Sequence, residues 1–316
     1  MAARFSAVPG RTRFRFLPNA SPKSGLAARN PMKAQVSPKQ LARAIQVSES
    51  SVKRWCDQGG IMTVRTAGGH RRIAIAAVLR FLRENCYELV RPEVLGLPAN
   101  AGRTAWVLDR AQAAFRDALL SADEDQARRI LFDLYLAKHP LPAMLDDVMA
   151  AALRGIGERW SRGEAAVYQE RRGCEICLRL LHELRMVAST PSVPRGLAMG
   201  GTPEGDMYQI PNAMVELVLR LQGWETISLG SGLPFDTLRA ALLTHRPRLF
   251  WLSASYIRDE REFLAGWNEL CAPLTFPVAF TTGGQALLEP LRGQMPQATF
   301  CNDLKALEAM AESLGE

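Results

Sequence analysis

The chain of 316 residues is long enough for two or three domains. No run approaches the ~20 apolar residues of a membrane-spanning helix, and six scattered cysteines fit a reduced, cytoplasmic protein better than a disulfide framework. Residues 1–91 hold 17 Lys and Arg against 4 Asp and Glu, a net of +13, whereas the whole chain carries +7, which leaves −6 for residues 92–316. A basic excess at one end predicts that this end binds a polyanion. The remaining residues are net acidic, so their charge alone would not attract nucleic acid.

The first 35 residues are basic and rich in Pro, Ser and Ala, and they lack the apolar run of a signal peptide. This composition favours a disordered basic arm over residues 1–35, with Met32 as a candidate for the true initiator. An arm that contacts DNA is the alternative interpretation, because its charge is positive.

Residues 36–90 have the pattern of a winged helix-turn-helix. Ser37-Pro38-Lys39-Gln40 is a helix start with a capping box, and Ser48 can cap a second helix that a glycine pair ends. Two short strands, 61–65 and 70–73, then flank a glycine-containing turn. A third helix with one apolar face completes the pattern.

The outward side of the second predicted helix is polar and cationic, and the hairpin adds more cations. Such a helix can enter the major groove of duplex DNA, while hairpin arginines reach phosphates or the minor groove. Lys53 and Arg54 are expected nearest base edges, and Arg71 and Arg72 nearest phosphates. A small solvated helical hairpin with a basic face is the alternative. The predicted DNA-binding residues are Ser50, Ser51, Lys53, Arg54, Arg65, His70, Arg71 and Arg72.

Four helical patterns follow residues 86–102, a stretch with Pro and Gly that is interpreted as a linker. Short connections between these helices predict an antiparallel bundle over residues 103–189. Cys174 and Cys177 lie within the last pattern without a second pair or nearby histidines, so positions in the bundle core are favoured over zinc or redox chemistry. The helices are expected near residues 103–120, 124–138, 142–162 and 164–188.

Residues 195–316 alternate between short apolar runs and helical patterns. This alternation predicts a doubly wound parallel sheet, which binds ligands at the carboxyl ends of its strands. Glycines at Gly200-Gly201, Gly230–Gly232 and Gly283-Gly284 are placed in loops there, although tight turns are the commoner reason for glycine. The expected strands are 196–201, 226–229, 249–255, 278–281 and 298–300, and the expected helices are 211–222, 234–244, 259–271, 285–292 and one at the C-terminus.

The segment Val47–Trp55, followed by Arg65–Arg72 with its run Gly-Gly-His-Arg-Arg, closely resembles the DNA-binding domain of MerR-type regulators. With the bundle and the flavodoxin-like sheet behind it, the chain from Val36 onward resembles the cobalamin-dependent photoreceptor repressors of the CarH group. The resemblance implies a multidomain α plus α/β protein: a winged helix-turn-helix, a four-helix bundle and a Rossmann-like cobalamin-binding-type domain. It also implies a palindromic operator in double-stranded DNA as partner, and we expect a homo-oligomer formed through the sensory domains.

The chain departs from this family where the family holds cobalt. The family's Trp, nine residues, Glu-His becomes Trp160, Glu170 and Arg171, and a guanidinium has no lone pair to donate. The family's Asp-x-His-x-x-Gly becomes Asp206, Tyr208 and a proline at 211, and a phenol of pKa about 10 replaces imidazole poorly. His182 lies eleven residues after Arg171, ~16 Å along a helix, and is too far away to substitute. Later pocket positions survive better: Ser253 and Ser255 occupy the family's Ser-x-Leu position, with serine in place of leucine at 255, and Gly283 and Gly284 occupy its Gly-Gly.

These departures predict a DNA-binding transcription regulator that has lost cobalamin and has no other cofactor. One alternative is an adenosylcobalamin-dependent light-sensing repressor, and another is a corrinoid-carrying methyltransferase subunit. No Ser-His-Asp set, recognisable paired carboxylates or metal-ligand cluster offers an enzymatic reaction. Arg171 and Arg172 hint at an anionic ligand, but a solvated helix face or an ion pair with Glu170 or Glu175 is the favoured interpretation. Trp160 fits the bundle core at least as well as a cofactor pocket. A protein partner for the sensory half is a further alternative.

Overall fold

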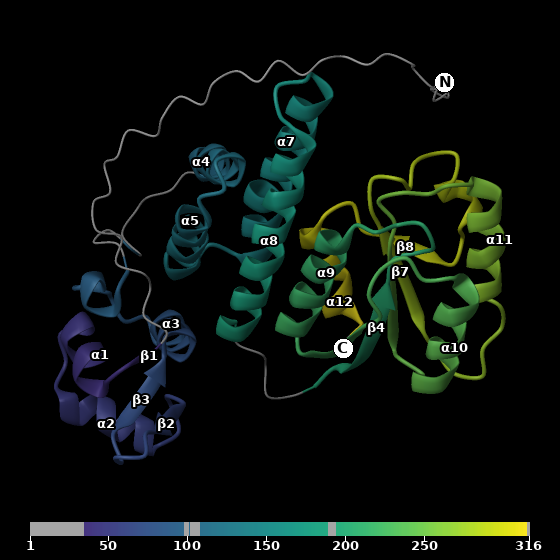
Figure 1. Ribbon diagram of the computed structural model, residues 1–316. Coiled ribbons are helices and arrows are strands. Elements are labelled where there is room, and N and C mark those ends of the chain that lie inside the picture. The colour runs from purple at the N-terminus through teal and green to yellow at the C-terminus, as the bar shows by residue number, and fades with distance from the viewer. Residues whose placement is uncertain (1–34, 98–100, 102–107, 189–193, 315–316) are drawn as a thin grey trace. The chain divides into compact units, whose positions relative to one another are not determined.

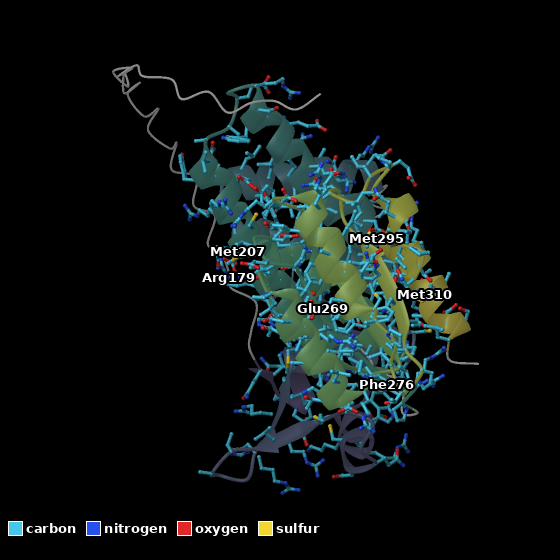
Figure 2. The ribbon with its side chains drawn as sticks, turned by 90° about the vertical axis from the view of Figure 1, so that its right-hand side faces the viewer. Arg179, Met207, Glu269, Phe276, Met295 and Met310 are labelled. Carbon is cyan, nitrogen blue, oxygen red and sulfur yellow. The ribbon has the colours of Figure 1, made fainter. Side chains whose placement is uncertain are left out.

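The computed structural model describes residues 35–97, 101, 108–188 and 194–314. Figure 1 shows the ribbon, and Figure 2 adds the side chains in a view turned by 90°. The basic arm expected over residues 1–35 lies outside the described residues except for its last position. Among the described residues, no helix combines the length and the apolar character that crossing a membrane requires.

A small sheet and three helices form the first domain, as the sequence predicts. The Ser37 hydroxyl accepts a hydrogen bond from the Gln40 N–H at 3.3 Å, and the Gln40 Oε1 accepts one from the Ser37 N–H at 2.8 Å, so the predicted capping box is confirmed. A short first strand, which the sequence analysis did not predict, adds to the hairpin and gives the antiparallel order β1-β3-β2. The elements are β1 (Gln35–Val36), α1 (Pro38–Ile45), α2 (Glu49–Asp57), β2 (Thr63–Arg65), β3 (Arg71–Ala74) and α3 (Ile75–Glu84).

The stretch after α3, interpreted as a linker from the sequence, is instead partly packed onto the first domain. Leu89, Leu95 and Leu97 are buried, and Leu95 is the last residue of a 3-10 turn, η1 (Pro92–Leu95). The Ala44 carbonyl at the end of α1 accepts hydrogen bonds from the N–H groups of two residues of this stretch, each at 2.9 Å. The linker interpretation was wrong there because it weighed proline and glycine above the three apolar side chains.

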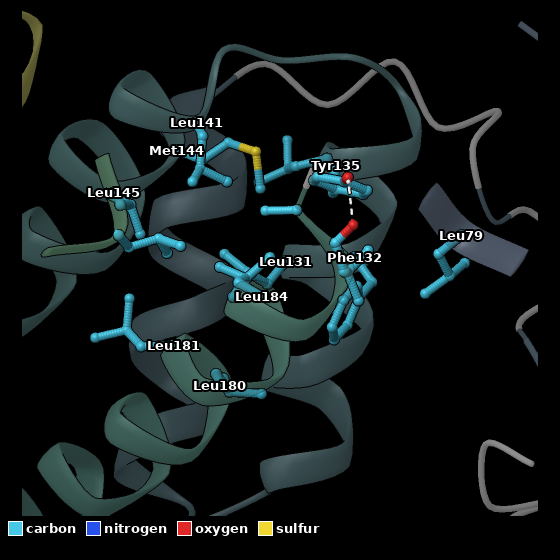
Figure 3. Packing of buried hydrophobic residues seen from close by; sticks show 14 of the residues in the cluster. Leu79, Leu131, Phe132, Tyr135, Leu141, Met144, Leu145, Leu180, Leu181 and Leu184 are labelled. Atoms are coloured by element: carbon cyan, nitrogen blue, oxygen red, sulfur yellow. Dashed lines mark hydrogen bonds between the residues drawn. The ribbon is translucent and has the colours of Figure 1, made fainter. Parts of the chain in front are cut away.

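The second set of helices forms a bundle around leucine, isoleucine and methionine side chains. Leu131, Leu180 and Leu184 meet in its centre, where the Tyr135 hydroxyl donates to the Val187 carbonyl at 3.2 Å (Figure 3). The third predicted helix is one continuous rod with a π-helical segment in its first half. The elements are α4 (Leu108–Leu120), α5 (Glu124–Leu136), α6 (Leu141–Ala143), η2 (Met144–Ala150), α7 (Ala151–Ser161) and α8 (Val167–Val187).

The prediction that the cysteine pair of α8 belongs to the bundle core is confirmed for Cys177, which is fully buried. Cys174 is half-buried one turn earlier, and burial raises the pKa of its thiol to about 11. A thiol with such a pKa stays protonated at neutral pH and is a poor nucleophile and metal ligand.

The last domain is a five-stranded parallel sheet with the order β5-β4-β6-β7-β8, so the predicted fold class is confirmed. Helices α9 and α12 pack on one face and α10 and α11 on the other (Figure 1). The strands are β4 (Gly196–Gly201), β5 (Trp224–Ser228), β6 (Leu249–Ser253), β7 (Ala279–Gly283) and β8 (Ala298–Phe300), and the helices are α9 (Gln209–Leu221), α10 (Phe235–His245), α11 (Glu260–Leu270) and α12 (Leu304–Ser313).

Two expectations for the helices of this domain were wrong. The helix predicted over 285–292 is absent, and only a short turn, η3 (Arg292–Gln294), follows, because Pro290 lacks the N–H that a helix interior needs. Helix α9 begins at Gln209, two residues before the proline that was expected to open it. Pro211 is still tolerated, because the first four N–H groups of a helix have no partner within the helix.

Candidate functional sites

Helix α2 presents a polar face to solvent and a bulky face to the domain core. Val52 is fully buried, and the Trp55 ring lies 5.1 Å from the rings of both Phe81 and Tyr87. This aromatic cluster fixes the rotation of the helix and turns the predicted DNA-binding side chains outward. Lys53 and Arg54 are exposed, as expected from the sequence.

The serines of the predicted interface form hydrogen bonds with one another at the start of α2. The Ser48 hydroxyl accepts the Ser51 N–H at 3.0 Å and lies 2.8 Å from the hydroxyls of both Ser50 and Ser51. Lys53 is paired as well, because its Nζ lies 2.9 Å from an oxygen of Glu49 one turn earlier. This hydrogen bond lowers the pKa of Glu49. Among the described residues, Arg54 has no such carboxylate partner.

The cationic side chains of the hairpin lie on an exposed turn and its flanking strand ends. Arg65 and His70 stand at the ends of the turn, where the Thr66 Oγ1 accepts the His70 N–H at 3.2 Å and Gly69 takes the positive φ of +77°. Only glycine adopts this conformation at little cost. The hairpin therefore presents Arg65 and His70 to solvent beside α2, which is the arrangement that phosphate or minor-groove contacts require.

Arg71 turns away from solvent, in contrast to the phosphate contact expected from the sequence. Its two terminal nitrogens lie 2.5 and 3.2 Å from the two carboxylate oxygens of Asp57, and Nη1 also donates to the Lys53 carbonyl at 3.1 Å. Arg72 donates to the Arg71 carbonyl at 3.2 Å. The sequence analysis missed Asp57, although an acidic residue in the last turn of a helix is unfavourable for the helix dipole and thus signals a partner.

The second candidate site lies at the carboxyl edge of the parallel sheet, where the family resemblance places a corrinoid. Asp206 is fully buried there. One of its carboxylate oxygens accepts the Tyr208 N–H at 2.9 Å, and the other accepts the N–H groups of Ser255 at 2.5 Å and Tyr256 at 3.2 Å. Burial raises the pKa of Asp206 although the three N–H donors lower it. The carboxylate thus joins the loop after β4 to the loop after β6.

Neighbouring side chains at this edge point outward. Tyr208 is 44% exposed and Met207, labelled in Figure 2, is 66% exposed. Ser253 is buried at the end of β6, and Ser255 is half-buried directly beyond it. Among the described residues, no three His, Cys, Asp or Glu side chains lie close enough together to hold a metal ion.

Several glycines of this edge pack against the chain itself, whereas a Cβ on Gly230 would meet no atom within 4 Å. Gly200 and Gly201 end β4 and are not in a loop, in contrast to the sequence-based expectation. A Cβ on Gly200 would overlap Trp251, whose Nε1 donates to Asn212 Oδ1 at 2.7 Å. A Cβ on Gly284 would overlap the Ala254 carbonyl, and one on Gly283 would lie 2.7 Å from the Cys301 carbonyl.

These contacts test whether the edge fits a corrinoid. The resemblance places a glycine that leaves room for the nucleotide tail where this chain has Pro211, within the first turn of α9. The Asp206 carboxylate is satisfied by backbone N–H groups, and no imidazole replaces the phenol of Tyr208. Neither Tyr208 at this edge nor Arg171 on the bundle supplies the imidazole nitrogen through which the resemblance holds cobalt.

The bundle positions of the resemblance lie on exposed helix ends. Trp160 is 50% exposed at the end of α7, so its assignment to the bundle core was wrong. Glu170 is half-buried, whereas Arg171 and Arg172 are exposed near the start of α8. Arg171 and Arg172 form no ion pair among the described residues and lie on a solvated helix face, which is one of the two favoured interpretations, and Glu175 lies 3.9 Å from Arg179.

Comparisons with known proteins match two separate parts of the chain. Residues 36–86 match the model of a helix-turn-helix domain, and residues 111–185 match that of a B12 binding domain. The chain is 29% identical over 257 residues to the HTH-type transcriptional repressor CarH of Myxococcus xanthus, with 74% of this chain and 84% of that protein covered. It is 23% identical over 263 residues to the repressor CarA of the same organism, with 80% and 87% covered.

Among solved structures, the monomethylamine corrinoid protein of Methanosarcina barkeri superposes with a TM-score of 0.58 at 15% identity. The match covers 66% of this chain and 99% of that one. At this identity the similarity shows the fold alone.

Proposed function

From a chain whose domains and relatives fit a CarH-like regulator, we propose a DNA-binding transcription regulator that operates without bound cobalamin and is not an enzyme. The observation that carries the proposal is the set of hydrogen bonds that the Asp206 carboxylate accepts. Its buried carboxylate accepts three backbone hydrogen bonds from its own and a neighbouring loop, at the edge where the relatives' fold would receive a corrinoid.

Charge and shape support the DNA-binding part. The basic excess of the chain lies in residues 1–91, and α2 and the hairpin present Arg54, Arg65 and His70 to solvent from neighbouring elements. A helix beside a basic hairpin fits the major groove and the adjacent backbone of duplex DNA. We propose a two-fold-symmetric operator, read by a homo-oligomer that the sensory domains hold together.

Both sides of the cofactor position support independence from cobalamin. Below it, Tyr208 offers an exposed phenol in place of the ligating imidazole. Above it, Arg171 offers a guanidinium with no lone pair. The loss of a single ligand would leave the other as an anchor, whereas here neither side offers a nitrogen that can bind cobalt.

An absorption spectrum tests this part directly. The protein is mixed with adenosylcobalamin in the dark and desalted, and DNA binding is measured before and after illumination. We expect no corrin absorption in the protein fraction and equal DNA affinity under all conditions. Corrin bands in stoichiometric amount would contradict the proposal and would establish the alternative of a light-sensing repressor.

A variant that restores the family's residues is the matched control. The substitutions Tyr208→His, Pro211→Gly and Arg171→His together should give measurable retention of adenosylcobalamin in the same assay. A triple variant with no gain would show that the pocket differs from the family's beyond these three positions.

The B12 binding domain match favours cofactor binding as the second candidate function, with Trp160 exposed on the bundle as the residue available to it. A corrinoid-carrying methyltransferase subunit is disfavoured by the N-terminal helix-turn-helix domain. A different ligand or a protein bound by the sensory half would be detected as a co-purifying component.

A further inference from the structure

We propose that Asp57 and Arg71 form a clamp that fixes the wing hairpin against helix α2, and that both act as positioning residues for DNA binding. The proposal rests on the proposed DNA-binding function and deepens it. It assigns to Arg71 a role within the domain in place of a phosphate contact, and it gives a function to the acidic residue that ends α2.

The contact geometry is that of a specific arginine–carboxylate pair. Two guanidinium nitrogens of Arg71 face the two oxygens of Asp57 at 2.5 and 3.2 Å, and the Lys53 carbonyl accepts a third hydrogen bond at 3.1 Å. Bidentate pairs of this kind fix orientation as well as distance. The guanidinium also lies at the carboxyl end of α2, where a positive charge is favourable for the helix dipole.

The hairpin has few other attachments to the domain. Strand β2 is an edge strand that pairs with β3 alone. From Met62 to His70 every residue except Thr63 is exposed, whereas Ile73 anchors the far end of β3 in the core. Arg71 lies directly opposite Arg65 in the strand register. The clamp therefore acts at the strand position that sets where Arg65 and the turn are presented.

A fixed wing matters because the helix and the hairpin must reach different parts of one duplex at the same time. Holding two binding elements in place before association avoids the entropy cost of ordering them in the complex. Loosening the hairpin should weaken binding even when every side chain that faces DNA is still present.

The sign of a charge change separates the clamp from a simple charge effect. Removing the Asp57 carboxylate removes a negative charge near a polyanion, so charge alone predicts tighter DNA binding. The clamp predicts weaker binding for the same substitution. Glu49→Gln is the matched control, because it removes another α2 carboxylate and frees Lys53 without touching the hairpin.

The test compares the full chain with its Asp57→Asn, Arg71→Lys and Glu49→Gln variants on a duplex selected from a random-sequence pool by the native protein. We expect Asp57→Asn and Arg71→Lys each to weaken binding about tenfold, which corresponds to ~1.4 kcal/mol. Glu49→Gln should bind as tightly as the native protein or more tightly. Arg71→Lys keeps the charge but cannot form the bidentate pair, so it separates geometry from charge.

Native affinity in both Asp57→Asn and Arg71→Lys would overturn the clamp. Weak binding by Arg71→Lys with tighter binding by Asp57→Asn would assign Arg71 to DNA instead. Hydrogen exchange of the free protein tests the clamp without DNA: the hairpin amides of Thr66 and Gly69, which are bonded to His70 O and Thr66 O, should exchange faster in both clamp variants. Unchanged exchange overturns the clamp, whereas a native chain that binds no duplex overturns only the proposed function.

Discussion

Replacing Asp206 by alanine removes the acceptor of three backbone hydrogen bonds at once. Tyr208 would lose its partner at the start of α9, and Ser255 and Tyr256 would lose theirs in the loop after β6. The substitution therefore separates two loops that no other described side chain joins in this way. We expect the loop after β6 to become mobile while the sheet stays folded.

The magnitude follows from the number and the setting of these bonds. A buried donor left without an acceptor costs about 1–3 kcal/mol, and the lower end applies where the donors are only partly buried, as here. Three donors give about 3 kcal/mol, which is offset in part because the variant no longer buries a carboxylate whose pKa burial has raised. The net loss in the free energy of unfolding is expected to be about 2 kcal/mol.

Urea denaturation measures the loss, and hydrogen exchange of the Ser255 and Tyr256 amides locates it. Asp259→Ala is the control, because Asp259 also accepts two backbone N–H groups, at 2.8 and 3.0 Å, but is exposed at the start of α11. Its loss should cost less than that of Asp206, because it removes only an exposed helix cap. Equal effects of the two substitutions, or unchanged exchange at Ser255 and Tyr256, would refute the reasoning.

Three further predictions concern stability. Leu184→Ala, at a fully buried position in the bundle, should lower the free energy of unfolding by about 2–5 kcal/mol in denaturant titrations. Ser37→Ala should cost about 1 kcal/mol and shift the melting of the DNA-binding domain, because α1 loses its cap. Burial raises the pKa of Asp146 from 3.8 to about 6, so its contribution to stability is full below about pH 4 and is lost as the pH rises through 6. Asp146→Asn should flatten the pH dependence of thermal unfolding in that window, whereas an unchanged profile would assign it to other groups.

Local features of the fold were predictable from the sequence. The capping box of α1 depends on residues three apart, and the parallel sheet follows from strands that alternate with helices. Such patterns depend only on residues that are close together in the sequence. The packed stretch around Leu95 was missed because its partners lie on α1, well before it in the sequence.

The sequence indicated which residue types make up the candidate sites, but it did not indicate which partners those residues contact. Arg71 looks like a phosphate ligand in the sequence, because a guanidinium beside other cations usually faces a polyanion. Its partner Asp57 lies 14 residues away across a turn and a strand. Asp206 and Ser255 lie 49 residues apart in the chain. Pairings at these separations depend on the tertiary structure, which no periodicity encodes.

These pairings reduce the positive charge that is free to meet DNA. Arg71 is neutralised by Asp57 and Lys53 by Glu49, whereas Arg54 and Arg65 are exposed without a carboxylate partner among the described residues. Each phosphate neutralised contributes about −0.9 to the slope of log affinity against log salt concentration. The slope should therefore be shallower than the net charge of +13 in residues 1–91 suggests.

Arg65→Ala should reduce this slope by about one for every protomer bound, as measured by fluorescence anisotropy in a salt titration. Glu49→Gln should make the slope steeper, because it frees the positive charge of Lys53 at the DNA-facing side of α2. An Arg65→Ala slope equal to that of the native protein would place the hairpin away from the DNA backbone. The interface would then be limited to helix α2, and a clamp on the hairpin would have no consequence for binding.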